Sequence, residues 1–167
     1  FIENNASLLQ QRSLVLASQG WHAGVLGIVA SQISNAYYRP VVLINTREGM
    51  GMGSGRSVAG LNLYDALASC KPYLESFVGH SMAAGLTIRV ENLTAFQRAL
   101  EKAVSQMAHP DDRIQKLTID TEISFDDISA QLVDEIESIG PFGTQNPEPL
   151  FMARNISVLS SKIVGQN

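Results

Sequence analysis

Hydrophobic and polar positions along the first hundred residues follow two periods, one typical of strands and one typical of helices. Short runs rich in branched apolar residues at 12–18 and 40–44 predict two buried strands. Between them, residues 24–33 combine apolar and small side chains in a pattern typical of a closely packed helix. A strand, a helix and a strand at this spacing predict a parallel crossover unit.

A strand of a different kind is expected over residues 50–56, because glycine occupies every second position there. We expect it to pair with the preceding strand as a hairpin through Glu48 and Gly49. The pattern then predicts helix over residues 61–77, with a break or a fresh start at Pro72.

Gly79 is a candidate cap for the end of that helix, and residues 83–90 predict a further strand. Asn92 is expected to be the N-cap of the next helix. The spacing of its apolar residues predicts one buried stripe, formed by Phe96, Leu100, Ala103, Val104 and Met107. Together these elements predict an α/β fold in which helices flank a mixed β-sheet.

The segment His109–Asp112 ends this helix and marks the expected domain boundary. We therefore expect one domain over residues 1–112 and a second part over 113–167. In the second part, residues 117–123 and 150–159 predict strands. Between them lies one expected helical face, formed by Ile128, Leu132, Ile136 and Ile139.

Composition places the chain among folded globular proteins, since 45% of its 167 residues are hydrophobic and 17% are charged. No apolar run has membrane-spanning length and no leader pattern is present. The single cysteine, Cys70, excludes an internal disulfide and is expected to be a core thiol in a cytoplasmic protein. Because the chain opens at Phe1 and stops after a strand-like run, we expect it to be a piece of a longer protein.

The distribution of charge is more informative than the net charge of −4, which argues against a protein that coats nucleic acid over its whole surface. Residues 1–100 hold seven Lys and Arg against five Asp and Glu, whereas residues 101–167 hold five against eleven. Seven carboxylates and no basic residue lie between Asp120 and Glu137. Any phosphate site is therefore expected in the first part of the chain.

The segment Gly51-Met52-Gly53-Ser54-Gly55-Arg56-Ser57 carries the clearest candidate chemistry. In a strand, one face would be bare, while Ser54 and Arg56 would share the other and could hold one phosphate together. If Gly53 and Gly55 instead curl into a loop, their N–H groups could form an anion nest. The alternative is a glycine-rich strand that allows close packing, with Arg56 solvated.

Two histidines lie in turns that suit a ligand site. His22 lies between a strand end and a helix start, where unpaired helix N–H groups favour an anion; the pattern favours the alternative, a histidine that caps the turn beside a core Trp21. His80 precedes a small-residue strand and is either a ligand-facing or a buried structural histidine.

Metal chemistry is not expected from this chain. Asp126 and Asp127 are adjacent, so that a helix or strand would point them apart, and the acidic stretch predicts a solvated face. Residues 1–100 contain one aspartate, Asp65, whereas a two-metal site needs several converging ligands. No Ser-His-Asp arrangement can be argued from histidines in unrelated turns.

Three ordered motifs make the chain similar to a known family. Residues 20–31, Gly53-Ser54-Gly55-Arg56-Ser57 and residues 79–85 resemble the DHH-associated domain of the RecJ exonucleases. The turn Gly140–Pro149 resembles the start of the OB-type domain that follows it in that family. The resemblance runs from about Arg12 to the end of the chain. It implies a DHH-associated domain followed by a partial OB-like β segment.

The resemblance also implies an activity and its site. The family degrades single-stranded DNA from the 5′ end in DNA repair and recombination, using Mn²⁺ or Mg²⁺ held by a preceding DHH domain. We therefore expect this chain alone to be inactive and to bind no metal. By resemblance, Ser54 and Arg56 hold the DNA end phosphate, with Ser57 a weaker candidate. His80 matches the histidine of a Gly-Gly-His motif at the cleft, although Val78 replaces its first glycine.

Two other functions remain open on the sequence. A DHH-family phosphodiesterase for short oligonucleotides or cyclic dinucleotides shares these motifs, but is not expected to continue into an OB-like segment. A catalytically inactive DNA-binding or scaffold protein on the same fold is the other. An intact Asp-His-His motif upstream would decide whether the longer protein is an enzyme.

Overall fold

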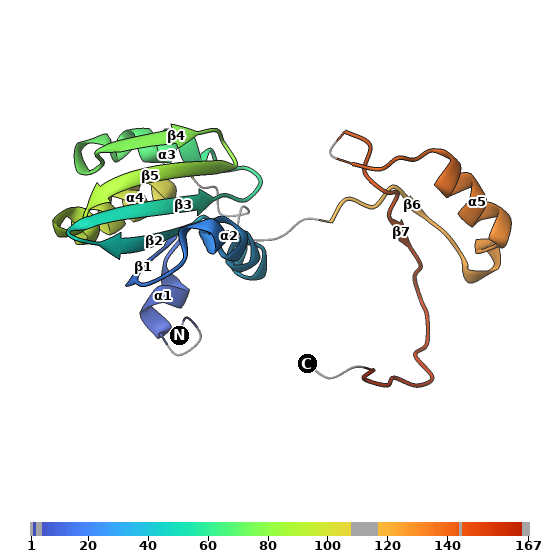
Figure 1. Ribbon diagram of the computed structural model, residues 1–167. Coiled ribbons are helices and arrows are strands. Elements are labelled where there is room, and N and C mark those ends of the chain that lie inside the picture. Colours follow the sequence, from blue (N-terminus) through green and yellow to red (C-terminus); the bar gives the residue numbers. More distant parts are fainter. Residues whose placement is uncertain (1, 3–4, 108–116, 144, 165–167) are drawn as a thin grey trace. The chain divides into compact units, whose positions relative to one another are not determined.

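The structure is a computed structural model that describes all residues except 1, 3–4, 108–116, 144 and 165–167 (Figure 1). The chain divides into two units, residues 1–115 and 116–167. The boundary predicted at His109–Asp112 lies outside the described residues.

A five-stranded mixed sheet with the order β1-β2-β3-β5-β4 forms the centre of the first unit (Figure 1). Strands β1 and β2 are parallel, as the predicted crossover requires, and the other neighbours are antiparallel. The predicted α/β fold with a mixed sheet flanked by helices is confirmed. The strands are β1 (Leu14–Gln19), β2 (Val41–Arg47), β3 (Met50–Arg56), β4 (Ser76–Gly79) and β5 (Ala83–Arg89).

The larger core lies between the sheet and helices α3 (Leu63–Ser69) and α4 (Leu93–Met107). The predicted stripe of α4 is confirmed, since Phe96, Leu100, Ala103 and Val104 are buried and Met107 packs at the margin. Burying a phenylalanine or leucine stabilises the fold by about 1.5–3 kcal/mol. Cys70, at the end of α3, is fully buried as predicted, and its burial raises the pKa of the thiol to about 11.

Helix α2 (Ala23–Tyr37) covers the opposite face of the sheet, together with the short helix α1 (Ala6–Gln10). Leu26 and Ala30 of α2 pack onto apolar residues of β1 and β2. The helix is longer than predicted and ends at Tyr37, followed by Tyr38, which adopts a left-handed conformation with φ 45°. Among the described residues, no helix combines the length and hydropathy that a bilayer crossing needs.

The predicted hairpin between β2 and β3 is confirmed. Its two central residues, Glu48 and Gly49, have φ values of 51° and 81°. Two successive positive φ angles characterise the type I′ turn, whose twist matches that of the paired strands. The hairpin therefore places β3 beside β2 in a fixed register, from Val41 opposite Arg56 to Arg47 opposite Met50.

The helix predicted to run to Phe77 is wrong in its second half. Helix α3 ends at Ser69, Pro72 lies in a 3-10 turn, and Ser76–Gly79 forms the edge strand β4. The open edge of β5 supplies hydrogen bonds that a lone helical turn would lack, and Phe77 packs against the larger core. Gly79 therefore ends a strand rather than capping a helix, with φ 155°.

Asn92 is not the helix N-cap that the sequence suggested. It lies in a 3-10 turn, Val90–Asn92, immediately before α4. Its side-chain amide donates to the carbonyl of Tyr73 at 3.4 Å, so that it connects this turn with the segment after α3.

The second unit contains one parallel strand pair, β6 (Thr121–Glu122) and β7 (Phe151–Met152), and the helix α5 (Ala130–Ser138). Both strands are much shorter than the predicted runs over 117–123 and 150–159. On the predicted helical face, Leu132 and Ile136 are half-buried, whereas Ile128 and Ile139 are exposed and lie just outside the helix. No described side chain of this unit is fully buried, which leaves its apolar residues little packing to fix longer strands.

Candidate phosphate-binding site

The two faces of β3 have different neighbours. Its glycines face the larger core, because a Cβ added to Gly51 would lie 2.7 Å from Cγ2 of Ile44 and one added to Gly55 would lie 2.9 Å from Cδ2 of Leu63. Gly53 is similarly close to Leu86. The glycines therefore serve close packing, as the alternative interpretation held, and they lie in a regular strand rather than in a loop.

Ser54 and Arg56 lie together on the other face of β3. Nη1 of Arg56 donates to Oγ of Ser54 at 3.1 Å and to the carbonyl of Gly55 at 2.8 Å. These two bonds fix the direction of the half-buried guanidinium. Within the described residues, Arg56 forms no ion pair, and its Nε and Nη2 donate no hydrogen bond. An arginine whose guanidinium is fixed in direction, with N–H groups that form no hydrogen bond and no carboxylate beside it, is suited to bind an anion.

Gly27 of α2 makes room for this guanidinium. A Cβ added at Gly27 would lie 2.5 Å from Nη2 of Arg56 and 3.3 Å from Oγ of Ser54. The sequence indicated small residues for close packing in this helix but did not connect Gly27 with the site. The only available signal was glycine at an interior helical position, which has a cost in stability and so needs a reason.

Ser57 holds the loop that follows β3. Its side chain is buried, and its hydroxyl donates to the carbonyl of Leu61 at 2.8 Å. Its N–H donates to the carbonyl of Met82, and its own carbonyl accepts from the hydroxyl of Ser34 at 3.3 Å. These contacts connect the end of β3 with α2 and with the turn before β5.

His80 lies in that turn, between β4 and β5, and is exposed. Its N–H donates to the carbonyl of Ala83, and its Nδ1 accepts from the N–H of Met82 at 3.2 Å. A ring nitrogen that accepts carries no proton, so the neutral ring has its proton on Nε2. The side chain thus has an outward donor, and the buried structural histidine that the sequence left open is wrong.

His22 is the N-cap of α2, because its Nδ1 accepts from the N–H of Gly24 at 3.2 Å. This is the turn-capping role that the pattern favoured. The accompanying expectation of a core aromatic is wrong, since Trp21 is 36% exposed.

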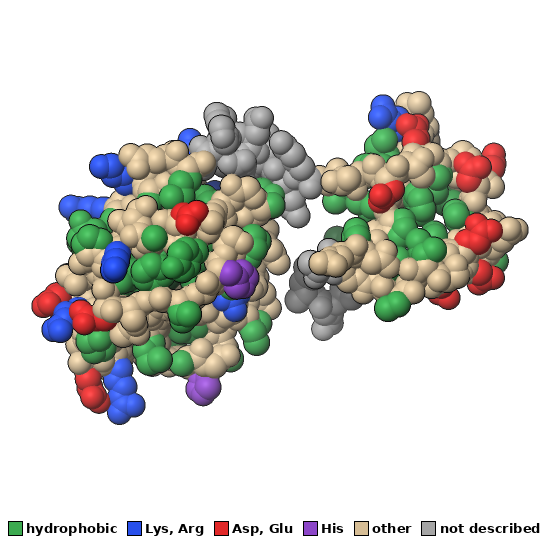
Figure 2. All heavy atoms as spheres, turned by 90° about the horizontal axis from the view of Figure 1, so that it is seen from above, with side chains coloured by type: hydrophobic (Ala, Val, Ile, Leu, Met, Phe, Trp, Pro, Cys, Tyr) green, Lys and Arg blue, Asp and Glu red, His purple; other side chains and the backbone are tan. Residues whose placement is uncertain are grey.

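The register of the sheet brings Arg56 and His80 to the same end of the strands. Arg56 is opposite Ala83, and Gly79 is opposite Ala84, so the end of β3 and the turn that carries His80 lie at the same end of the sheet. Figure 2 shows both described histidines at the surface of the first unit, one of them next to a basic side chain.

Asp120 and Asp127 accept hydrogen bonds within the second unit and take no part in the candidate phosphate-binding site. Asp127 accepts from the N–H and the hydroxyl of Ser124, which lowers the pKa of its carboxyl group. Asp120 accepts from the N–H of Leu150 at 2.8 Å. Among the described residues, no three His, Cys, Asp or Glu side chains lie close enough together to hold a metal ion.

Comparison with known proteins supplies the family. Residues 10–106 match the model of the DHHA1 domain, and residues 119–167 match that of the RecJ OB domain. The chain is 33% identical over 161 residues to the single-stranded-DNA-specific exonuclease RecJ of Bacillus subtilis, covering 95% of this chain and 20% of the relative. It is 33% identical over 159 residues to RecJ of Haemophilus influenzae, covering 92% of this chain and 28% of the relative.

A solved structure has the same fold. The crystal structure of RecJ from Thermus thermophilus with Mn²⁺ matches 88% of this chain and 22% of its own, with a TM-score of 0.75 and 31% identity. The chain thus spans between a fifth and 28% of the length of these proteins. The expected resemblance is confirmed: the chain belongs to the DHHA1 domain family, and its residues 119–167 match the OB domain of the RecJ proteins to which it is similar.

Proposed function

We propose that this chain is the substrate-binding part of a RecJ-type exonuclease, which hydrolyses single-stranded DNA from the 5′ end in cytoplasmic DNA repair and recombination. The relatives named as single-stranded-DNA-specific exonucleases support this proposal. Residues 1–112 form the substrate-binding domain in this proposal, and a preceding DHH domain of the longer protein is their partner. The match of residues 119–167 to the RecJ OB domain favours it over a DHH-family phosphodiesterase for short oligonucleotides or cyclic dinucleotides.

The state of Arg56 carries the proposal. Its guanidinium is fixed by Ser54 and the backbone, has no described carboxylate partner, and keeps two nitrogens as unused donors. A terminal phosphate can accept from this fork and from the hydroxyl of Ser54 at the same time. We propose that these two side chains hold the end of the DNA strand and thereby determine which phosphodiester bond is presented for hydrolysis.

The other candidates have supporting roles in this proposal. His80 offers Nε2–H as a donor toward the DNA, while its Nδ1 fixes the turn. Ser57, whose hydroxyl is used within the fold, holds Arg56 and the turn in place instead of contacting phosphate. Gly53 and Gly55 let the strand lie flat on the core, and His22 caps the helix that covers Arg56.

The metal of such an enzyme is not expected to bind to this chain. RecJ structures are described with Mg²⁺ and with Mn²⁺, but the described residues contain no fitting group of ligands. Divalent ions of this kind need several converging oxygen ligands. We therefore assign them to the preceding DHH domain of the longer protein.

The test is substitution of Arg56 in the longer protein that contains this chain. Arg56→Ala is expected to weaken binding of a 5′-phosphorylated single strand by about 1.5–3 kcal/mol, the range of a hydrogen bond to a charged group. Arg56→Lys should recover part of this loss, because an ammonium keeps the charge but not the planar fork. Binding of 5′-phosphorylated and 5′-hydroxyl strands and degradation rates are the measurements.

Arg98→Ala is the matched control, since Arg98 is an exposed arginine on α4, on the other side of the sheet. It should change neither binding nor degradation, and all three variants should keep their melting temperature. Unfolding of Arg56→Ala, or unchanged DNA processing by it, would contradict the site. Binding of the end without any hydrolysis by the wild-type protein would instead indicate an inactive DNA-binding relative.

A further inference from the structure

The face of the sheet that carries Arg56 continues beyond the part that α2 covers. Directly opposite residues in neighbouring strands point to the same face. Ser54 of β3 is opposite Gly85 of β5, which is opposite Val78 of β4. Met52 begins the next row, opposite Thr87. These positions therefore form one surface that starts at the phosphate-binding side chains and crosses three strands.

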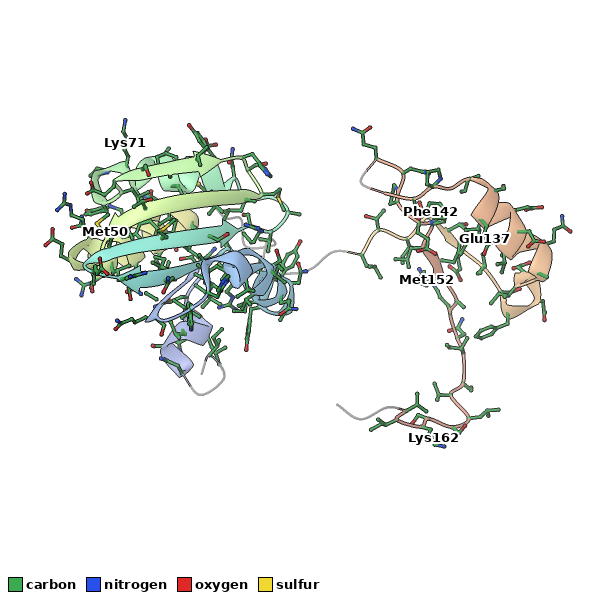
Figure 3. All side chains as sticks on the ribbon, in the orientation of Figure 1. Met50, Lys71, Glu137, Phe142, Met152 and Lys162 are labelled. Carbon is green, nitrogen blue, oxygen red and sulfur yellow. The ribbon has the colours of Figure 1, made fainter. Side chains whose placement is uncertain are left out.

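This surface is open and carries exposed apolar side chains beside the hydroxyl groups of Thr87 and Ser76. Met52 is 61% exposed and Val78 is 75% exposed, although both belong to regular strands. In Figure 2, hydrophobic side chains lie at the surface of the first unit between a basic side chain and a histidine. Met50, labelled in Figure 3, extends the row at the beginning of β3 and is 36% exposed. Arg89, opposite Met50, forms an ion pair with Glu75 at 2.8 Å. This end of the surface is therefore neutralised, whereas Arg56 at the other end has no ion pair among the described residues.

Gly85 forms a hollow in the middle of this surface. A Cβ added there would find a single atom within 4 Å, the backbone oxygen of Gly53 at 3.9 Å. This contrasts with the core-facing glycines of β3, where an added Cβ would collide with packed side chains. Gly85 thus leaves bare backbone between the hydroxyl of Ser54 and the side chain of Val78, about two strand spacings or ~10 Å apart.

We infer that this surface, defined by Met52, Gly85 and Val78, binds the sugar and base of the nucleotide whose phosphate Arg56 and Ser54 hold. The inference rests on the proposed function and adds the place of the nucleoside to it. The nucleoside is covalently attached to the phosphate, so it must lie within a few ångströms of Ser54. The surface next to Ser54 offers apolar contacts and a flat floor to a planar ring, and the carboxylate at its far end, Glu75, is paired with Arg89.

Recognition on this surface is independent of base identity. Met52 and Val78 contact ring faces and sugar, and they have no hydrogen-bonding group that distinguishes one base from another. Every base has such a face, so contacts of this kind tolerate any sequence. The surface should therefore distinguish a strand that has a terminal base from one that lacks it, but not adenine from thymine.

The experiment compares two 5′-phosphorylated strands in the longer protein that contains this chain, one of them with an abasic terminal residue. The wild-type protein should bind the normal strand about tenfold more tightly, since a contact of about 1.4 kcal/mol is a tenfold change. Gly85→Val fills the hollow and should remove most of this preference while leaving the abasic strand unaffected. Met52→Ser, which truncates an exposed side chain and cannot disturb the core, should reduce the preference in the same way.

Ala68→Val is the matched control, because it adds a similar side chain at an exposed position of α3, beyond the opposite face of the sheet. It should keep the full preference. An unchanged preference in Gly85→Val and Met52→Ser overturns the inference. So does an equal loss for both strands or a lowered melting temperature in Met52→Ser, which would indicate that another protein surface covers this face. The proposed function is tested separately, by comparing how the wild-type protein and Arg56→Ala bind 5′-phosphorylated and 5′-hydroxyl strands.

Discussion

Arg56 combines two properties that rarely occur together in one side chain. It is half-buried and its direction is fixed by Ser54 and a backbone carbonyl, yet no described carboxylate neutralises it. A buried or half-buried charge usually has a partner, because desolvation is costly. The absence of such a partner among the described residues favours a ligand, whereas an arginine kept only for stability would have an acidic neighbour.

Gly27→Ala tests the space that α2 leaves for this guanidinium. The new methyl group would lie 2.5 Å from Nη2, so the flexible end of Arg56 has to move. Alanine is the better helix former by about 1 kcal/mol, so the melting temperature should stay the same or rise. DNA-end binding should fall by about tenfold or more, the loss of roughly one hydrogen bond to a charged group. Thermal unfolding and binding to a 5′-phosphorylated strand are the two measurements.

Asn35→Ala is the control for the helix effect, because Asn35 is exposed on the same helix. It should leave binding unchanged. A Gly27→Ala protein that binds DNA ends normally would show that the position of Nη2 does not matter.

The candidate site was partly predictable from the sequence. The period of two in β3 was sufficient to place Ser54 and Arg56 on one face, because that alternation is a property of the strand itself. It could not show that Ser57, one residue further, is buried and donates to Leu61. Nor could it show that Gly27 touches Arg56. Ser57 lies against Ser34 and Met82, and Gly27 lies against Arg56. These partners are far apart in the chain, so a local pattern carries no information about them.

At the scale of elements, the sequence succeeded where one segment determines its own structure. The β2–β3 hairpin and the buried stripe of α4 follow from turn chemistry and helical spacing. The edge strand β4 was missed because its strand conformation depends on hydrogen bonds from β5. Its four residues are too few to show a strand pattern of their own, and pairing with β5 determines their conformation.

A carboxylate on α4 fixes the beginning of β1. The N–H groups of Arg12 and Ser13 donate to Glu101 at 2.8 and 2.9 Å, and the hydroxyl of Ser13 donates at 2.7 Å. Glu101→Ala removes the acceptor for all three donors, and should lower the free energy of unfolding by about 2–3 kcal/mol. Chemical denaturation measures this change.

Gln106→Ala on the same helix is the comparison, because Gln106 is exposed. It should change the free energy of unfolding by less than about 0.5 kcal/mol. If both substitutions cost the same, the contacts of Glu101 do not hold the strand.

At the scale of the whole molecule, the two units differ in how they are stabilised. Every fully buried side chain among the described residues lies in the first unit. In the second, Leu159 is 97% exposed, and the strand pair consists of two residues on each side. Hydrophobic burial is the main favourable contribution to folding, so we assign nearly all of the stability to residues 1–115.

A shortened protein that ends at residue 115 should therefore unfold at the same temperature as the 167-residue chain. Both melting curves are measured by circular dichroism under identical conditions. Leu100→Ala, which removes a fully buried side chain, should lower the midpoint equally in both, since it costs about 2–5 kcal/mol. A lower midpoint in the shortened protein alone would mean that the second unit stabilises the first.

The alternation along β3 also acts against misfolding. Because side chains in a strand repeat every two residues, a slip of one residue against β2 and β5 exchanges the two faces. In the slipped strand, the guanidinium of Arg56 would point into the apolar core. Side chains would also replace the glycines that now make room for Ile44, Leu63 and Leu86. An unpaired buried charge costs several kcal/mol, so the competing pairing is excluded. The arginine that is proposed to hold DNA thus also helps to select the correct register of the strand that carries it.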